Sequence, residues 1–241
     1  MQTTQRILLI SNSTLYGGGY LDHAENEIRN LLGPSGRVLF FPYALFDRDG
    51  YAAKARERFA AMGYELNSAH AAGDPAAAII QADAIFIGGG NTFRLLKALQ
   101  DFDLLEPIRR RILEGAPYIG SSAGSNVAGP TIKTTKDMPI VQPRSFDSLG
   151  LVPFQISPHF QDSDPNSKHM GETQEERILQ FHEENETPVL GMREGAWVRI
   201  DGRSVVLRGT NGARIFRRGQ APVEAATGEE ISSFVGAPHD G

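Results

Sequence analysis

Residues 84–91 read AIFIGGGN. A run of four apolar residues ends in three glycines, and an amphipathic stretch over residues 92–99 follows at once. This change of pattern is typical of a buried strand that turns directly into a helix. Because parallel sheets are assembled from strand–helix units, the segment predicts an α/β fold. It places the glycines at the sheet edge where open α/β sheets bind ligands.

The same alternation continues on both sides of this segment. Short apolar runs typical of buried strands and helical patterns follow one another along most of the chain. The apolar runs are at residues 7–10, 38–41 and 118–119, and the helical patterns at 22–32, 47–62, 74–81, 104–115 and 173–184. The sequence therefore predicts a mostly parallel open sheet with helices on both faces.

The C-terminal part has a different pattern. Residues 197–216 contain turn signals at Asp201-Gly202 and Asn211-Gly212, which predict a C-terminal β-meander. Small residues prevail after Gly219, so we expect the tail from about residue 220 to be loosely ordered. Neither a linker nor an internal repeat interrupts the chain, which predicts a single domain over residues 1–241.

Composition excludes several classes of function. The 241 residues carry 24 basic and 29 acidic side chains and form no basic patch, so we expect no nucleic-acid partner. No apolar run approaches the roughly 20 residues of a membrane span, and no signal peptide opens the chain, which predicts a cytoplasmic protein without a membrane partner. Cysteine is absent, which excludes disulfides, zinc thiolate sites and a cysteine nucleophile.

A candidate nucleophile follows the predicted strand at residues 118–119. Residues 120–124 read GSSAG and fit the pattern G-x-S-x-G, with a short helix expected over residues 122–128. A nucleophilic serine needs such a sharp strand-to-helix turn with small neighbours. Ser122 is therefore the candidate nucleophile and Ser121 the weaker one. The alternative is a structural turn in which the serine only caps the helix.

The glycines of the first segment suggest an oxyanion site. Gly89 and Gly90 lie where backbone N–H groups can point outward, and the amide of Ala123 opens the helix after Ser122. Together these amides could hold an oxyanion beside the serine. A phosphate-binding loop and close packing of strand against helix are the two alternatives. We favour the oxyanion role because it works together with Ser122.

A serine nucleophile needs a base, and the base needs an acid. His159 lies in ISPHF at residues 156–160, at the end of an apolar run, and is the candidate base. Two acids compete. Glu194 follows the strand expected at residues 189–190 and is marginally favoured, whereas Asp137 lies in the loop-rich segment before His159. Either carboxylate could instead form a surface ion pair with a neighbouring cation.

The ordered set of these segments resembles peptidase E, the aspartyl dipeptidase family, which is related to cyanophycinase. The matching segments are LLISNST at residues 8–14, GGGNTF at 88–93, IGSSAG at 119–124, TTKDMPI at 134–140, PHF at 158–160, GET at 171–173 and EG at 194–195. The resemblance implies a class I glutamine amidotransferase-like fold and a serine peptidase that hydrolyses short peptides with a free N-terminal aspartate. It implies no metal and no organic cofactor.

Three residues are the candidate substrate ligands: Asn91, Gln174 and Arg177. The resemblance places an arginine directly after the GET segment, where it would meet the aspartate side chain of the substrate. Here Gln174 stands at that position, with Arg177 one helical turn further on. Glutamine can donate a hydrogen bond to a carboxylate but carries no charge. The sequence therefore predicts weaker selectivity for aspartate than the resemblance implies.

A second function remains open at this point. Residues 11–17, which read SNSTLYG after the first strand, could form the phosphate loop of a flavodoxin-like nucleotide-binding module without peptidase activity. The favoured partner is a short peptide, and a homodimer is the candidate assembly.

Overall fold

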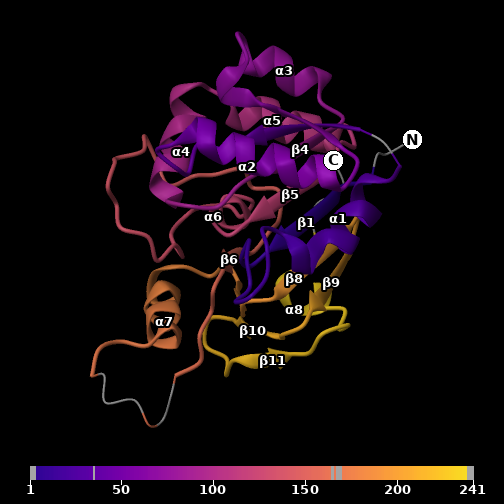
Figure 1. The fold of residues 1–241 in the computed structure, drawn as a ribbon. Helices are drawn as coiled ribbons and strands as arrows, with labels where there is room; N and C mark the ends of the chain where they lie inside the picture. The colour runs from indigo at the N-terminus through magenta and orange to yellow at the C-terminus, as the bar shows by residue number, and fades with distance from the viewer. Residues whose placement is uncertain (1–3, 35, 164–165, 167–169, 238–241) are drawn as a thin grey trace.

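The computed structural model describes residues 4–34, 36–163, 166 and 170–237. Its main sheet has seven strands in the order β3-β2-β4-β5-β1-β8-β9 (Figure 1). The strands of this sheet are β1 (Arg6–Ile10), β2 (Arg37–Phe41), β3 (Glu65–Ser68), β4 (Ala84–Ile87), β5 (Tyr118–Ser121), β8 (Ala196–Asp201) and β9 (Ser204–Gly209). The first five are parallel, and β8 and β9 extend the sheet antiparallel beyond β1.

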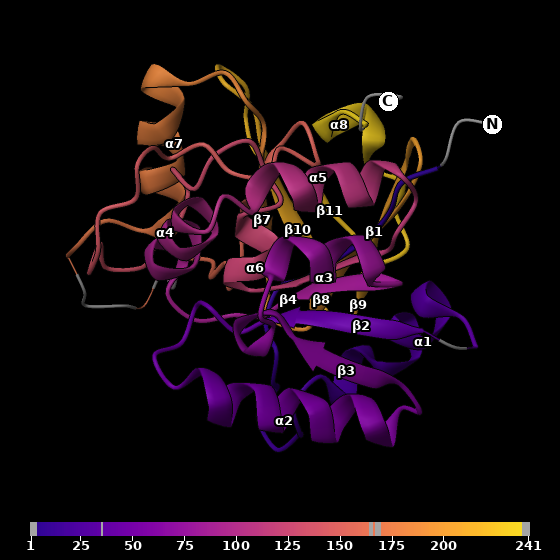
Figure 2. The same cartoon turned by 90° about the horizontal axis from the view of Figure 1, so that it is seen from above.

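Helices cover both faces of this sheet (Figure 2). One face carries α1 (Glu25–Leu32), preceded by the short helix η1 (Asp22–Ala24), and α2 (Arg48–Ala61). The other face carries α3 (Pro75–Gln81), α4 (Thr92–Asp101), α5 (Leu105–Leu113) and α6 (Ala123–Asn126), and the short helix η2 (Ala69–Ala71) follows β3. The predicted α/β fold with a mostly parallel sheet is confirmed.

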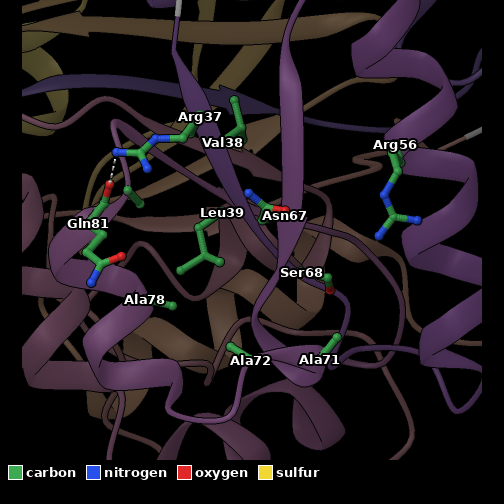
Figure 3. A pocket seen from close by; sticks show the side chains of 11 residues that line it. Arg37, Val38, Leu39, Arg56, Asn67, Ser68, Ala71, Ala72, Ala78 and Gln81 are labelled. Atoms are coloured by element: carbon green, nitrogen blue, oxygen red, sulfur yellow. Dashed lines mark hydrogen bonds between the residues drawn. The ribbon is translucent and has the colours of Figure 1, made fainter.

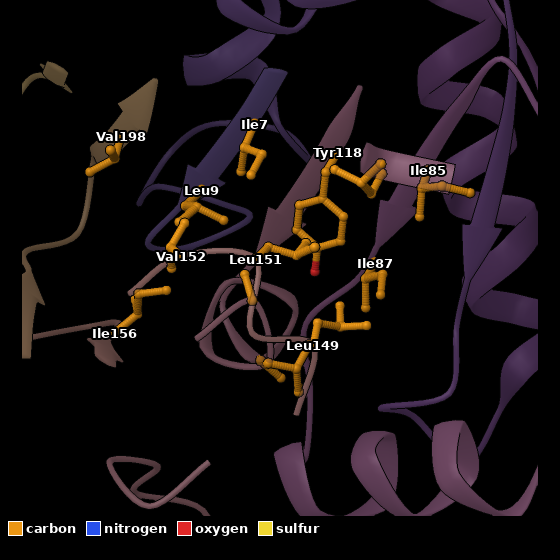
Figure 4. Packing of buried hydrophobic residues seen from close by; sticks show 14 of the residues in the cluster. Ile7, Leu9, Ile85, Ile87, Tyr118, Leu149, Leu151, Val152, Ile156 and Val198 are labelled. Carbon is orange, nitrogen blue, oxygen red and sulfur yellow. The ribbon is translucent and has the colours of Figure 1, made fainter. Parts of the chain in front are cut away.

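The two faces of the sheet use alternate residues of the strands, as the pleat requires. Leu8 and Ile10 of β1 belong to the cluster under α1 and α2, whereas Ile7 and Leu9 belong to the larger cluster on the opposite face. Figure 4 shows Ile7 and Leu9 on the same side as Tyr118, where the chain segment after α6 covers them. That segment contributes Leu149, Leu151, Val152 and Ile156 to the larger cluster.

A second sheet of four strands, in the order β11-β10-β7-β6, lies below the main sheet in Figure 1. Its strands are β6 (Gln155–Ser157), β7 (Val189–Met192), β10 (Ala213–Phe216) and β11 (Val223–Ala225). Strands β6 and β7 run parallel, and the others are antiparallel. Helix α7 (Gln174–Glu184) packs Ile178 into a small cluster with Phe160, Val189 and Phe216.

The predicted C-terminal β-meander is wrong. Strands β8 and β9 do form a hairpin, but β10 pairs with β7 and β11 of the second sheet and not with β9. The chain leaves the main sheet at Gly209, whose φ of 107° favours glycine. The turn signal at Asn211-Gly212 therefore connects strands of two different sheets.

The C-terminal segment carries regular structure where the sequence suggested loose order. Strand β11 pairs with β10, and α8 (Ser232–Val235) follows it. Ala225, Ile231 and Val235 are buried in the larger core cluster. The small residues that suggested a loose tail are interspersed with these apolar anchors. Within the described residues, no helix is both long enough and apolar enough to cross a bilayer.

Candidate active site

Ser122 lies on a sharp turn between β5 and α6. Its backbone has φ 53° and ψ −110°, a strained conformation for a residue with a side chain. The Ser122 amide donates to the carbonyl of Ile10 at 2.9 Å, so the end of β1 holds the turn. Ser122 is partly exposed, whereas the Ser121 side chain is fully buried. The turn thus presents only the second serine to a substrate.

The two glycines of the G-x-S-x-G pattern are required by close packing. An ideal Cβ at Gly124 would overlap the carbonyl oxygen of Ile87 in β4, and one at Gly120 would lie 2.6 Å from the carbonyl oxygen of Gly124. Both obstacles are backbone atoms and cannot rotate away. Both glycines of the pattern are therefore needed for α6 to pack against β4 and β5.

We expect Gly124→Ala to lower the free energy of unfolding by about 1–3 kcal/mol, the usual cost of overpacking. The added methyl group must displace either α6 or β4. Gly73→Ala is the matched control, because a Cβ there meets no atom of the described part of the chain within 4 Å. Urea denaturation measures both variants. Equal stability of the two would show that the turn accepts a side chain at residue 124.

His159 and Glu194 reach Ser122 from the second sheet. Ser122 Oγ lies 2.8 Å from His159 Nε2, and His159 Nδ1 lies 2.8 Å from Glu194 Oε1. His159 follows β6 and Glu194 follows β7, each by two residues. Because β6 and β7 are neighbouring parallel strands with Ser157 opposite Gly191, the two side chains emerge side by side. The structure brings these three predicted residues into one hydrogen-bonded chain.

Backbone contacts hold His159 in an unusual conformation with φ 54°. Its amide donates to Ser11 Oγ at 2.9 Å, and Ser11 Oγ in turn donates to the carbonyl of Met192 at 2.9 Å. Its carbonyl accepts from Lys136 Nζ at 2.8 Å and from Gln174 Nε2 at 3.4 Å. The backbone that carries the imidazole is therefore positioned by groups from three other segments of the chain.

The Lys136 ammonium lies beside the acidic groups of the site. Burial lowers the pKa of Lys136 to about 8, and the nearby carboxylates of Asp137 and Glu194 oppose that shift. Its proton is therefore held less firmly than that of an ordinary lysine. Its bond to the carbonyl of His159 helps to fix the backbone of the candidate base.

Glu194 is held through its backbone and its neighbours. Asn12 Oδ1 accepts from the amide of Gly195 at 2.7 Å, and Asn211 Nδ2 donates to the carbonyl of Glu194 at 2.6 Å. The adjacent cation, Arg193, pairs with Asp162 at 2.7 Å and with Glu224 at 3.0 Å. Those carboxylates raise the pKa of Arg193. Because Arg193 is engaged elsewhere, the Glu194 carboxylate is left to His159.

Asp137, the competing acid, lies at the start of α4. Its Oδ2 accepts from the amide of Thr92 at 2.7 Å and from Thr92 Oγ1 at 2.6 Å. A carboxylate at a helix N-terminus satisfies free N–H groups and interacts favourably with the helix dipole. Asn91, a predicted substrate ligand, is the N-cap of the same helix: its Oδ1 accepts from the amide of Arg94 at 3.0 Å, and its Nδ2 donates to the carbonyl of Met138 at 2.9 Å.

The predicted oxyanion donors lie at the carboxyl end of β4, beside the serine. An ideal Cβ at Gly89 would lie 2.9 Å from the Cβ of Ser122, so the two backbones are in close approach. Gly90 has φ 133°, and a side chain there would meet the carbonyl oxygen of Ala44 at 2.8 Å. Ala123 begins α6, and its N–H is among those of the first turn that have no partner within a helix.

The other two predicted substrate ligands lie near His159 but are engaged by protein groups. Gln174 Oε1 accepts from the amide of Gln161 at 3.0 Å, and its amide nitrogen contacts the carbonyl of His159. Arg177 is exposed and pairs with Glu172 at 3.7 Å. Gln174 thus joins the start of α7 to the backbone around His159.

A cleft of about 490 Å³ opens at Ser122 and His159. Residues from several elements line it: Ser13, Tyr20, Leu45, Asp47, Gly50, Tyr51, Lys54, Gly89 and Gly90. A different cavity of about 310 Å³, shown in Figure 3, lies beside β2 and β3 and is lined by Arg37, Arg56 and Asn67 among others. None of its lining residues belongs to the Ser122–His159–Glu194 chain, so the first cleft is the candidate active site.

Sequence reasoning missed two groups of residues at this site. Ser11 and Asn12 belong to the segment LLISNST that carries the family resemblance and to the alternative phosphate loop, but the sequence assigns them no contact with His159 or Glu194. Tyr51 and Lys54 of α2 gave no sequence signal, because their pattern is that of an ordinary amphipathic helix.

Comparisons with known proteins identify the family of this chain. The family model "Peptidase family S51" matches residues 7–208. Peptidase E of Streptomyces coelicolor is 51% identical over 229 residues, which cover 95% of this chain and 94% of the relative. A probable alpha-aspartyl dipeptidase of Drosophila melanogaster is 45% identical, covering 90% of this chain and 92% of its own length. Peptidase E of Salmonella paratyphi A is 43% identical, covering 93% and 99%.

Solved structures share the fold at lower sequence identity. A putative peptidase E from Listeria monocytogenes superposes with a TM-score of 0.65 at 21% identity, covering 87% of this chain and all of that chain. A peptidase from an acI-B1 Actinobacterium gives a TM-score of 0.72 at 17% identity, covering 95% and 97%. On the family match and on relatives of 43–51% identity along nearly the whole chain, the protein belongs to peptidase family S51.

Proposed function

We propose that this protein hydrolyses short peptides with Ser122 as nucleophile, and dipeptides with an N-terminal aspartate foremost. The observation that carries the proposal is the hydrogen-bonded chain Ser122 Oγ–His159 Nε2 and His159 Nδ1–Glu194 Oε1, with 2.8 Å at each step. A nucleophile bonded to a base that a carboxylate orients is the arrangement that activates serine.

In the proposed reaction His159 Nε2 takes the proton of Ser122 while Oγ attacks the peptide carbonyl. The carbonyl oxygen becomes an oxyanion, for which the amides of Gly89, Gly90 and Ala123 are the candidate donors. His159 then gives its proton to the departing amine, and the C–N bond breaks to leave an acyl-serine. Water, deprotonated by the same imidazole, releases the acyl group, while Glu194 stabilises the imidazolium at each stage.

The substrate class rests on the relatives and on the shape of the site. Relatives of 43–51% identity carry the names peptidase E and alpha-aspartyl dipeptidase. The cleft of about 490 Å³ suits a ligand of a few residues. The alternative of a phosphate loop at residues 11–17 finds no support, because Ser11 binds His159 and Asn12 binds Gly195.

Several sequence-based expectations remain predictions. They are the single domain over residues 1–241, the glutamine amidotransferase-like class of the fold, the homodimer, the absence of a nucleic-acid partner and the cytoplasmic location. The inclusion of residues from both sheets in one core cluster supports the single domain.

A panel of dipeptides tests the proposed function. We expect the purified protein to release free amino acids from Asp-Leu faster than from Asn-Leu, Ala-Leu or Leu-Leu, and to leave N-acetyl-Asp-Leu largely intact. Chromatography of the released amino acids measures the rates, and Ser122→Ala protein is the control for contaminating peptidases. Absence of release from every unblocked dipeptide would contradict the proposal.

A further inference from the structure

One wall of the cleft consists of side chains from α2 and the segment before α1. Tyr51 and Lys54 are three residues apart on α2, which places them on one face of the helix. Both line the cleft that contains Ser122 and His159, as does Tyr20. Lys54 Nζ lies 4.9 Å from the centroid of the Tyr20 ring, a cation–π contact.

Tyr20 and Tyr51 link Lys54 to the region around Ser122, and neither of them cancels the positive charge of the lysine. Tyr20 donates to the Tyr51 hydroxyl at 3.2 Å, and the two rings meet edge to face at 6.1 Å. Burial raises the pKa of both phenols, so both stay neutral near pH 7. The backbone of Gly89 lies beside the Tyr51 hydroxyl and also against Ser122. The ammonium of Lys54 therefore lines the cleft beside two neutral tyrosines.

Lys54 is the cationic side chain best placed to meet a substrate anion. Lys136 donates to the carbonyl of His159, and Arg177 pairs with Glu172; neither lines the cleft. Among the described residues no carboxylate lies within ion-pair distance of Lys54 Nζ. Asp47, the acid that lines the same cleft, caps α2 by accepting from the amide of Gly50 at 2.9 Å.

We infer that Lys54 binds a carboxylate of the peptide substrate. The inference rests on the proposed function and names a residue that binds the substrate of that reaction. The Lys54 ammonium supplies a positive charge that the side chain of Gln174 lacks. The Gln174 amide is, in addition, bonded to the backbone of residues 159 and 161. An Asp-X dipeptide offers two carboxylates, the aspartate side chain and the C-terminus, and both present the same chemistry to an ammonium group.

The experiment compares Lys54→Met with wild type on Asp-Leu, Asn-Leu and Asp-leucinamide. We expect kcat/KM for Asp-Leu to fall about 10- to 100-fold, the range for a hydrogen bond to a charged group. For the substrate that lacks the carboxylate bound by Lys54, either Asn-Leu or Asp-leucinamide, kcat/KM should change little. Lys54→Arg should restore part of the loss. Arg56→Met is the matched control. It removes a cation from the same helix, but Arg56 lines the other cavity (Figure 3).

The ratios identify the carboxylate. A lower Asp-Leu to Asn-Leu ratio in Lys54→Met assigns Lys54 to the side chain, and a lower Asp-Leu to Asp-leucinamide ratio assigns it to the C-terminus. Either result supports the inference, whereas two unchanged ratios overturn it.

A binding measurement separates this inference from the proposed function. Calorimetric titration of Asp-Leu into Ser122→Ala protein, with and without Lys54→Met, reports recognition without turnover. Weaker binding in the double variant supports Lys54 even if the wild type hydrolyses none of the dipeptides, which would defeat only the proposed function. Equal affinity of the two proteins counts against Lys54 even if hydrolysis is observed.

Discussion

Ser122→Ala is expected to give a folded protein whose kcat is lower by at least about a thousandfold, the usual scale for removal of a triad nucleophile. The reason is the single contact of 2.8 Å between Ser122 Oγ and His159 Nε2, through which the base acts. Alanine keeps the small size that the turn requires, so the fold should be preserved. Initial rates on Asp-Leu and circular dichroism measure the two properties.

Ser121→Ala is the matched control for this experiment. The Ser121 side chain is fully buried at the end of β5, and its hydroxyl finds no hydrogen-bond partner among the described residues. We therefore expect its removal to leave kcat within a few-fold of wild type. His159→Ala should match the loss of Ser122→Ala, and the double variant should be little worse, because members of a triad act as a unit. Full activity in Ser122→Ala together with an inactive Ser121→Ala would show that Ser121 is the nucleophile.

Glu194→Gln is expected to lower kcat on the order of a hundredfold. Glutamine preserves the size of the side chain but removes the charge that stabilises the imidazolium of His159. A fully buried triad acid is worth about 10⁴ in kcat. Glu194 is 51% exposed in its side chain, so water compensates part of the loss. Steady-state kinetics on a dipeptide measures the effect.

Asp137→Asn is the comparison that decides between the two acids. Its carboxylate accepts from the amide and hydroxyl of Thr92 at the start of α4. We expect a loss of stability of about 1 kcal/mol, typical for a weakened helix cap, and a much smaller loss of kcat than for Glu194→Gln. The reverse order of the two kcat values would make Asp137 the acid of the triad.

The sequence predicted those parts of the molecule that are determined locally. The turn at Ser122 was predictable because Gly120 and Gly124 are required wherever a helix starts this close to a sheet. The parallel strands were predictable because each apolar run is followed by its own helix. The choice between Glu194 and Asp137 was not, since both are acids beside a lysine or arginine, and only the pairing of β6 with β7 brings Glu194 to His159.

The second sheet could not be predicted for the same reason. Strands β6 and β7 are separated by α7, and β10 pairs with β7 across β8 and β9, so the contacts are non-local. Lys54 is a further example. On a sequence pattern it is one exposed residue of an amphipathic helix, and only the proximity of Tyr20 and Ser122 makes it a candidate ligand.

The division of the site between two sheets bears on how the enzyme is made. The candidate nucleophile Ser122 and the candidate oxyanion donors lie at the edge of the first sheet, whereas His159 and Glu194 follow strands of the second. During synthesis on the ribosome, the nascent chain acquires Ser122 long before Glu194. It stays without a complete triad until β7 has emerged and joined β6. With the proposed triad, newly made protein cannot cleave peptides before its C-terminal half has folded, and neither half released as a fragment would carry all three residues.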